Sequence, residues 1–150
     1  MSRKGIPVTL IKEMLPLINN EIKSILSNVV PFTVELEIED GSNSMEIYIN
    51  YGDSKRIIEC GSGMEKMISS IAIRVALINI SSLPKSDMLI IDEGFGALDE
   101  NNLEACSRLL QSLKKWFKTI LIISHVDAIK DIVDDTIEIL SKEKDAYVKY

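Results

Sequence analysis

The stretch Met88-Leu89-Ile90-Ile91-Asp92-Glu93 is a short apolar run that ends in two adjacent carboxylates. A second apolar run, Thr119 to Ile123, follows a segment that starts near Asp99 and has the pattern of a helix of about 17 residues. Short uninterrupted apolar strands separated by a helix are typical of buried parallel strands joined by a right-handed crossover. This βαβ unit predicts an α/β fold.

The chain before this unit changes from helical to strand patterning. Apolar residues recur at helical spacing from Pro7 to Ser27, a helix in which Pro16 should introduce a kink or a break. From Phe32 to Ile38 the period becomes two, and a polar turn cluster leads to a second alternating segment, Met45 to Ile49. The pattern therefore predicts a β-hairpin, followed by a third short strand through Arg56 to Glu59.

Three further segments complete the organisation. A helix from Glu65 to about Ser81 is apolar over most of its circumference, as expected for a helix packed between layers. After the second parallel strand we expect a short helix over Val126 to Val133. A terminal hairpin should follow, formed by Thr136 to Leu140 and Ala146 to Tyr150.

Composition and charge narrow the function classes. Of the 150 residues, 46% are hydrophobic and 27% charged, enough for one core of ordinary size but not for two. With 17 Lys and Arg against 23 Asp and Glu, the formal charge of −6 argues against a generally basic nucleic-acid binder, although it leaves room for a local basic groove.

Cys60 and Cys106 are too few for a disulfide framework. Because no apolar signal-peptide segment precedes Pro7, we expect a reducing, intracellular setting. No apolar run approaches the roughly 20 residues that span a bilayer, so we expect no membrane association.

Asp92 and Glu93 are the first candidate functional residues. In an open parallel sheet the ligand crevice lies beyond the carboxyl ends of the strands, where these side chains would project. The first carboxylate can hold Mg²⁺ through water, while its neighbour polarises an attacking water as a general base. The alternative is an acidic turn after a core strand, and the dipeptide alone does not decide between them.

His125 is the only histidine in the chain, and it follows the second parallel strand in the run Ile122-Ile123-Ser124-His125. An imidazole at the carboxyl end of a strand can donate a hydrogen bond to a terminal phosphate. For a histidine considered alone, a surface or structural role is the alternative. Because the βαβ unit makes the two strands neighbours, however, it predicts that His125 and the Asp92-Glu93 pair lie at one edge of the sheet.

A polar loop, Gly61-Ser62-Gly63-Met64-Glu65, opens the apolar helix. Exposed amide donors and the positive end of a helix suit an anion such as phosphate, and the Ser62 hydroxyl would add a donor. Ser62 with Glu65 three residues later is also a capping box, which is an ordinary structural feature. Capping and phosphate binding can coexist in one loop.

In their order along the chain, three motifs resemble the signature loop, the Walker B motif with its D-loop, and the histidine switch of ABC-type ATPases. The motifs are Gly61-Ser62-Gly63-Met64-Glu65-Lys66, Asp92-Glu93-Gly94-Phe95-Gly96-Ala97-Leu98-Asp99 and Ile123-Ser124-His125. The continuation after Glu93 is similar to the carboxyl-terminal ATPase lobe of SbcC-type double-strand-break-repair ATPases, which are relatives of the SMC proteins. The segment from Lys4 to Pro16 is similar to the place where the returning coiled-coil arm enters that lobe.

The resemblance implies roles for the residues around the parallel strands. Asp92 would support Mg²⁺, Glu93 would activate the hydrolytic water, and His125 would contact the γ-phosphate. Asp99 would lie in the D-loop, along the seam between two subunits.

It also implies roles around the signature loop. Ser62 and Gly63, with the start of the Glu65 helix, would contact ATP bound to the opposite subunit. Arg74 matches a basic position on the signature helix that relays the nucleotide state. Met64 departs from the usual second glycine of the signature, a difference that bears on how closely the backbone approaches phosphate.

By the same resemblance, the chain is the carboxyl-terminal half of an ABC-type P-loop ATPase head, with a parallel βαβ core and a small antiparallel hairpin region. The resemblance implies a single lobe over residues 1–150. Its parts would be a coiled-coil exit helix over 1–30, antiparallel strands over 31–60, and a core over 61–150 that carries the signature, Walker B motif, D-loop and histidine switch.

No Gly-x-x-x-x-Gly-Lys-Ser/Thr loop occurs in the chain, so it lacks the amides and the lysine that hold the β- and γ-phosphates. We therefore expect ATPase activity only after association with an amino-terminal Walker A lobe. The resemblance implies a homodimer around two ATP molecules, and DNA-end processing with an SbcD-type nuclease. The chain could be an excised half, one product of a split chain or a naturally separate subunit, and the sequence leaves these alternatives open.

Two rival functions and the DNA contact also remain open at this stage. One rival is another SMC-like or ABC-type ATPase with a different partner, and the other is a non-catalytic lobe that regulates a full-length ATPase. Charged helix faces are usually only solvated, which is the alternative for every proposed DNA contact. The candidate phosphate contacts are Arg3, Lys4, Lys114, Lys115 and Lys118. The expected location is cytoplasmic, either at the nucleoid or in a host cytoplasm, or nuclear in a eukaryote.

Overall fold

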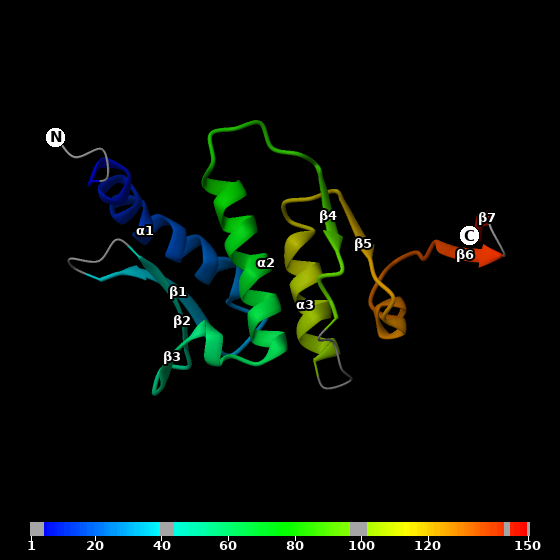
Figure 1. The fold of residues 1–150 in the computed structure, drawn as a ribbon, viewed down its shortest axis with the longest axis horizontal. Helices are drawn as coiled ribbons and strands as arrows, with labels where there is room; N and C mark the ends of the chain where they lie inside the picture. Colours follow the sequence, from blue (N-terminus) through cyan, green and yellow to red (C-terminus); the bar gives the residue numbers. More distant parts are fainter. Residues whose placement is uncertain (1–4, 40–43, 97–101, 143–144, 150) are drawn as a thin grey trace.

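A computed structural model describes residues 5–39, 44–96, 102–142 and 145–149 (Figure 1). In chain order its elements are α1 (Gly5–Leu26), β1 (Thr33–Ile38), β2 (Met45–Asn50), β3 (Lys55–Ile57), the 3₁₀ turn η1 (Ile58–Cys60), α2 (Gly63–Ile80), β4 (Met88–Asp92), α3 (Leu103–Leu113), β5 (Thr119–Ile123), the 3₁₀ turn η2 (Asp127–Asp131), β6 (Glu138–Lys142) and β7 (Asp145–Lys149).

The strands form three separate sheets. β1, β2 and β3 make an antiparallel sheet in that order, β4 and β5 pair in parallel, and β6 and β7 form an antiparallel hairpin. The chain passes from β4 through α3 to β5, so the predicted βαβ unit and the α/β class are confirmed. Within the described residues, no helix combines the length and the apolar character that crossing a bilayer requires.

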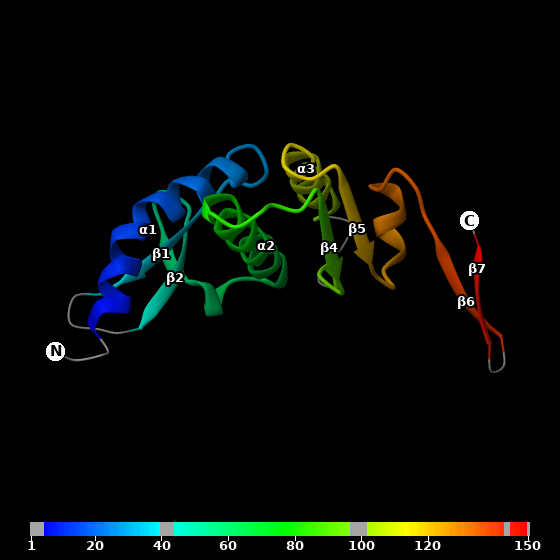
Figure 2. The same cartoon turned by 90° about the horizontal axis from the view of Figure 1, so that it is seen from above.

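α1 remains one helix of 22 residues, although Pro16 lies inside it. Proline removes a backbone donor and crowds the preceding turn, and Figure 2 shows the helix axis curving along its length rather than breaking. The second half of the helix buries Ile18, Ile22 and Ile25 in the core. The predicted apolar stripe therefore is the packed face of this half.

Besides the shared core, one polar side chain links α1 to β1. Asn19 Nδ2 donates to the carbonyl oxygen of Leu36 (3.0 Å), and the Leu36 amide donates to Asn19 Oδ1 (2.9 Å). Since β1 is an edge strand of its sheet, the Asn19 amide group makes the two hydrogen bonds that a further strand would make there. The helix is thereby held in a fixed register against the sheet.

Several predicted element boundaries are wrong. The first strand of the terminal hairpin, β6, is Glu138–Lys142 rather than Thr136 to Leu140. β3 ends at Ile57 rather than Glu59, because η1 follows it directly. α3 has 11 residues and ends at Leu113, although the apolar pattern continues: Phe117 is buried as well, but its amide bonds back to Leu113 in a turn. The helix expected over Val126 to Val133 is the shorter η2.

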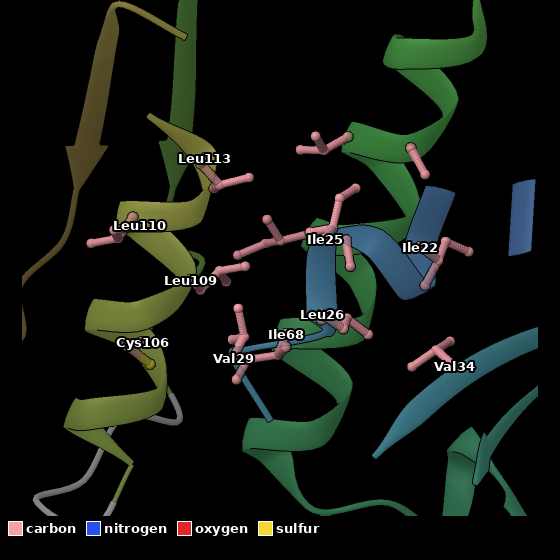
Figure 3. Packing of buried hydrophobic residues seen from close by; sticks show 14 of the residues in the cluster. Ile22, Ile25, Leu26, Val29, Val34, Ile68, Cys106, Leu109, Leu110 and Leu113 are labelled. Atoms are coloured by element: carbon pink, nitrogen blue, oxygen red, sulfur yellow. The ribbon is translucent and has the colours of Figure 1, made fainter. Parts of the chain in front are cut away.

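One hydrophobic core joins the three helices and the first sheet. Figure 3 shows side chains of α1 and its exit, Ile25 and Val29 among them, meeting Ile68 of α2 and Leu109 of α3. α2 packs along α1 (Figure 2) and buries one of its sides, with Ile68, Ala72 and Val75 among the buried residues. Leu77 and Ile78 are exposed, so the nearly uniform apolar character of the helix does not mean that it is covered all round. The helix that begins at the signature loop is thus central to the core.

The expectation that β4 and β5 are buried strands is wrong for one of their two faces. Leu89 and Ile91 of β4 pack against the hydrophobic core, whereas alternate residues lie on the opposite face of the strand. Figure 2 shows α3 on one side of the β4–β5 pair, which leaves the other face bare. The large apolar residues of this bare face are Met88 (49% exposed), Ile90 (57%), Leu121 (43%) and Ile123 (48%). Parallel sheets normally have both faces covered, and this one has a single covering helix in the described chain.

Candidate functional site

The carboxyl ends of β4 and β5 bring the predicted catalytic residues together. Asp92 is the last residue of β4, and the Glu93 amide donates to the Ile123 carbonyl oxygen at 2.9 Å, which extends the pairing by one residue. His125 Nδ1 lies 3.0 Å from Glu93 Oε2 and 3.3 Å from Glu93 Oε1, and both side chains are exposed. The parallel register alone places these groups side by side, as the sequence predicts.

The Glu93 backbone adopts φ 51°, and Glu93 is the one non-glycine residue with positive φ in the described ranges. Left-handed backbone is unfavourable for a residue with a side chain, so surrounding structure must hold it there. Phe95, two residues later, is fully buried, and a Cβ added to Gly94 would lie 2.6 Å from Ile91 Cγ2. The buried Phe95 side chain and the close approach of Gly94 to Ile91 therefore hold the turn in which Glu93 lies.

Ser62 caps the N-terminus of α2 and forms the capping box that the sequence predicts. Ser62 Oγ accepts a hydrogen bond from the Glu65 amide (3.2 Å), and the Ser62 amide donates to Glu65 Oε2 (2.6 Å). The capping role is confirmed, while phosphate binding by Ser62 and Gly63 stays a prediction. Met64 lies inside α2, and its side chain packs against the core. The backbone at this position is helical and does not need a glycine, so the fold accommodates methionine where the signature usually has its second glycine.

The Glu65 side chain points into the protein. It is 3% exposed, and its Oε1 accepts hydrogen bonds from the Tyr51 hydroxyl and from Arg56 Nη2, both at 2.6 Å. Burial alone would raise the pKa of Glu65, but hydrogen bonds from Tyr51, Ser62 and Arg56 outweigh it and lower the pKa from 4.5 to about 2. The carboxylate is therefore an internal anion, and a nucleotide contact at this position would involve the start of the helix rather than this group.

Sequence reasoning missed Tyr51 and Arg56. Tyr51 lies in the turn that joins β2 to β3, and Arg56 lies in β3, so they reach Glu65 from 14 and 9 residues away in the chain. No periodicity or motif links an aromatic residue in a turn with a helix N-terminus. The two donors become visible only when the hairpin is folded against α2.

The signature loop and the His125-Glu93 pair lie toward the same end of the molecule. Figure 1 shows the N-terminus of α2 and the carboxyl ends of β4 and β5 all directed toward the lower edge of the view. Arg74 is exposed further along α2, and its relay role stays a prediction. Asp99 lies outside the described residues, so its place in a D-loop also stays a prediction.

The candidate DNA-contacting residues differ in whether they already form ion pairs within the chain. Lys114 pairs with Asp134 (2.8 Å), and Lys118 pairs with Asp87. Lys115 is exposed and lines a shallow pocket of about 290 Å³ between the end of α1 and α3. Arg3 and Lys4 lie outside the described residues.

The residues present suit a magnesium ion that is held largely by its substrate. In the part of the chain that the structure describes, no three acidic, histidine or cysteine side chains gather into a metal-binding group. Mg²⁺ is commonly bound through one or two carboxylates together with waters and nucleotide phosphates. Asp92, exposed at the end of β4, provides a carboxylate of this kind.

Comparison with known sequences identifies relatives that are much longer than this chain, and no family model matches it. An uncharacterised protein of Acanthamoeba polyphaga mimivirus is 33% identical over 154 residues, covering 93% of this chain and 11% of that protein. The SbcC component of the nuclease SbcCD is 30% identical over 120 residues in Clostridium acetobutylicum and 30% over 117 in Staphylococcus saprophyticus, with 78% and 74% of this chain covered. The chain spans 10% and 12% of those two SbcC proteins, about a tenth of their length.

SMC ATPase heads are among the solved structures that have the same fold. An SMC ATPase structure from work on ATP-driven dimerisation and DNA-stimulated activation has a TM-score of 0.75 at 20% identity, covering 94% of this chain and 87% of that chain. The head of an Smc protein bound to the C-terminal winged-helix domain of ScpA has a TM-score of 0.71 at 21% identity, with coverage of 97% and 46%. The chain is therefore similar in sequence to a segment of SbcC proteins, and it has the fold of SMC head domains.

Proposed function

We propose that the chain is the carboxyl-terminal lobe of an ATPase head that binds and hydrolyses ATP, with Mg²⁺, at an interface between two heads. The observation that carries this proposal is the 3.0 Å pair of His125 Nδ1 and Glu93 Oε2 at the ends of two paired parallel strands. A carboxylate at this edge can accept a proton from water, and an imidazole beside it can donate to a phosphate oxygen. The likeness to the SbcC component of SbcCD supports the same chemistry.

The bound nucleotide, with its magnesium ion, would supply the phosphoryl group that is transferred to water. Asp92 would hold the magnesium ion, in part through water. Glu93 would orient the attacking water and take its proton, and His125 would donate a hydrogen bond to the terminal phosphate. On this proposal, the turn anchored by Phe95 keeps the Glu93 carboxylate at the strand ends before nucleotide arrives.

The second part of the proposal is an amino-terminal Walker A lobe as partner. The bare apolar face of β4 and β5, which includes Ile90 and Leu121, supports this pairing, because a parallel sheet exposed on one face is completed by covering it. The chain also corresponds to 46% of one solved Smc head chain and 50% of an SMC head from Thermotoga maritima. A lobe of this size leaves about half of a head for the partner.

The third part concerns the arrangement of two heads. Ser62 and Gly63, at the N-terminus of α2, would contact ATP held by the opposite head, and Asp99 would lie along the seam between them. The amide donors in the first turn of an 18-residue helix, together with its positive end, support an anionic ligand beside Ser62 and Gly63.

We extend the proposal to DNA-end processing with an SbcD-type nuclease, in an intracellular location. The names of the SbcCD relatives support the nuclease partner. Cys60 and Cys106 are both thiols and do not form a disulfide, which suits a reducing compartment. Lys115, exposed beside the shallow pocket, is the described lysine that we favour as a DNA phosphate contact.

The test is reconstitution with the amino-terminal lobe. The chain alone should hydrolyse no ATP above background, and the two lobes together should show Mg²⁺-dependent turnover. Glu93→Gln should abolish this turnover while ATP binding and ATP-bound dimers persist, because an amide keeps the shape of the side chain but accepts no proton. Glu104→Gln, which changes an exposed carboxylate on α3, is the matched control. Robust hydrolysis by the chain alone would refute the half-site proposal, and a reconstituted head that binds ATP without turnover would favour the regulatory alternative.

A further inference from the structure

The carboxylate of Glu65 joins three elements that are separate in the sequence. Oε1 accepts hydrogen bonds from the Tyr51 hydroxyl and Arg56 Nη2, and Oε2 accepts one from the Ser62 amide, each at 2.6 Å. Tyr51 belongs to the turn between β2 and β3, and Arg56 to β3. The β2–β3 hairpin therefore contacts the signature loop through Glu65.

The two donors on the hairpin are themselves held in place. The Tyr51 ring lies 5.4 Å from the ring of buried Phe32, and the Tyr51 amide donates to the Ser54 carbonyl oxygen at 2.9 Å. The Arg56 guanidinium lies 5.6 Å from the centre of the Tyr51 ring, in cation–π contact range. Glu65 is thus bound by two donors that also contact each other and the hairpin, and these donors hold the orientation of its carboxylate from the side of the hairpin.

This arrangement determines what Ser62 can offer to a ligand. A serine hydroxyl has one donor and two acceptor lone pairs. Ser62 Oγ uses a lone pair to accept from the Glu65 amide, and the Ser62 amide is committed to Glu65 Oε2. Among the described residues no acceptor is found for the Ser62 O–H, and Ser62 is exposed, so this donor is available to a ligand that approaches the loop.

Arg56 also compensates the negative charge of Glu65 near the signature loop. Glu65 places a buried negative charge three residues from Ser62, at the loop that would approach a triphosphate. Arg56 is half exposed, and its Nη2 is 2.6 Å from the carboxylate, so it compensates this charge locally. Without Arg56, an approaching phosphate would meet an uncompensated carboxylate in addition to the amide donors.

We propose that Tyr51 and Arg56 are positioning residues that act through Glu65 to hold the signature loop ready for a phosphate of the opposite head. Glu65 is itself a positioning residue on this proposal and not a nucleotide ligand. The inference rests on the proposed function of Ser62, and it assigns the β2–β3 hairpin a role in nucleotide-driven dimerisation.

The test uses the chain reconstituted with its amino-terminal lobe and compares two variants with two controls. Tyr51→Phe removes only the hydroxyl, and Arg56→Met removes the charge while keeping much of the stem. Tyr48→Phe removes a hydroxyl from β2 of the same hairpin. Lys55→Met removes the neighbouring cation of β3, whose partners are Glu35 and Glu37.

We measure ATP binding to the separate head and the ATP-driven dimerisation of heads by analytical ultracentrifugation. Tyr51→Phe and Arg56→Met should each weaken dimerisation by about tenfold, the loss expected for one hydrogen bond to a charged group. ATP binding by the separate head should be unchanged, because the Walker A lobe holds that nucleotide. Arg56→Lys should recover part of the lost dimerisation, and both controls should behave as the unmodified head.

A second measurement needs no nucleotide. Hydrogen exchange at the Ser62 amide should be faster in Tyr51→Phe and Arg56→Met than in the controls, because this amide donates to the Glu65 carboxylate. The Glu65 amide, which donates to Ser62 Oγ in the same capping box, should exchange faster as the box loosens. If Arg56→Met fails to fold, Tyr51→Phe still decides both measurements.

The outcomes separate the inference from the function on which it rests. If unmodified heads dimerise with ATP but the Tyr51 and Arg56 variants dimerise equally well, or if Lys55→Met is equally impaired, the positioning role is wrong and the proposed function stands. If unmodified heads bind ATP and do not dimerise, the proposed function of Ser62 fails, and the inference fails with it. Weakened dimerisation together with faster exchange, in the two variants alone, supports the positioning role.

Discussion

At the scale of single residues, Glu65 combines burial with a charge that must be kept. Its carboxylate is 3% exposed and accepts hydrogen bonds from Tyr51, Arg56 and the Ser62 amide. A buried charge is tolerated only when such partners compensate its lost hydration. The same partners therefore tie the stability of the folded chain to the ionisation of this group.

The first prediction concerns acid stability. Burial opposes ionisation of Glu65, but its hydrogen bonds lower the folded-state pKa from 4.5 to about 2, so the folded state favours the carboxylate. The stability that it contributes should be fully present above pH 4.5 and be lost as the pH falls from 4.5 toward 2. Glu65→Gln should destabilise the chain by about 1–3 kcal/mol at pH 7 and by much less near pH 2.

Urea unfolding at several pH values measures this difference, with Glu59→Gln as the control. Glu59 is an exposed carboxylate of η1, and it is not among the hydrogen-bond or ion-pair partners of the Glu65 group. The control should follow the unmodified chain at every pH. A Glu65→Gln variant whose loss of stability is the same at pH 7 and pH 2 would show that the ionisation of Glu65 is not linked to folding.

The residue scale also shows what sequence can and cannot predict. Ser62 and Glu65 form a capping box with a local spacing, so the sequence predicts their contact. The contact of Glu93 with His125 is also predictable, because a strand–helix–strand unit places β4 and β5 side by side in parallel and so brings their carboxyl ends together. The roles of Tyr51 and Arg56 are not, since their contact with Glu65 depends on how a turn folds back over a helix.

At the scale of elements, the contact between α1 and β1 is a further example of what a sequence pattern does not reveal. Asn19 lies on α1 one residue from the buried Ile18, and its side chain binds both backbone groups of Leu36. A polar residue in a helical pattern is normally assigned to the solvent side. The end of α3 escapes prediction for a related reason: buried Phe117 continues the apolar pattern although its backbone has left the helix.

The second prediction tests the Asn19 contact. Asn19→Ala should destabilise the chain by about 1–3 kcal/mol, because it leaves the amide and carbonyl of the buried Leu36 without these partners. Asn20→Ala is the matched control: it makes the same change one residue later, at an exposed position of the same helix. Urea unfolding of both variants at pH 7 measures the difference. Equal stability of the two variants would mean that the edge of β1 finds other partners when Asn19 is absent.

At the scale of the whole molecule, the described chain packs α2 into a shared core but leaves one face of the β4–β5 pair uncovered. α1, α3 and the first sheet share one buried core with α2. The parallel pair contributes to that core from one face and exposes large apolar residues such as Ile90 and Leu121 on the other. The uninterrupted apolar runs of these strands are typical of burial on both faces, and the described chain provides one covering layer.

The third prediction follows from this asymmetry and rests on the proposed Walker A lobe. The double variant Ile90→Thr and Leu121→Thr keeps strand-compatible residues but removes apolar surface from the bare face. Since these side chains are already 57% and 43% exposed, the chain alone should keep its stability to within about 0.5 kcal/mol. Association with the amino-terminal lobe should weaken by about tenfold or more, because apolar area that would be buried between the lobes is lost.

Isothermal titration of one lobe into the other measures this affinity. Leu77→Thr and Leu83→Thr, which change residues at the end of α2 and just beyond it that are 44% and 72% exposed, are the matched control and should leave the affinity unchanged. If the β4–β5 variant binds its partner as tightly as the unmodified chain does, the bare face is not where the two halves of the head meet.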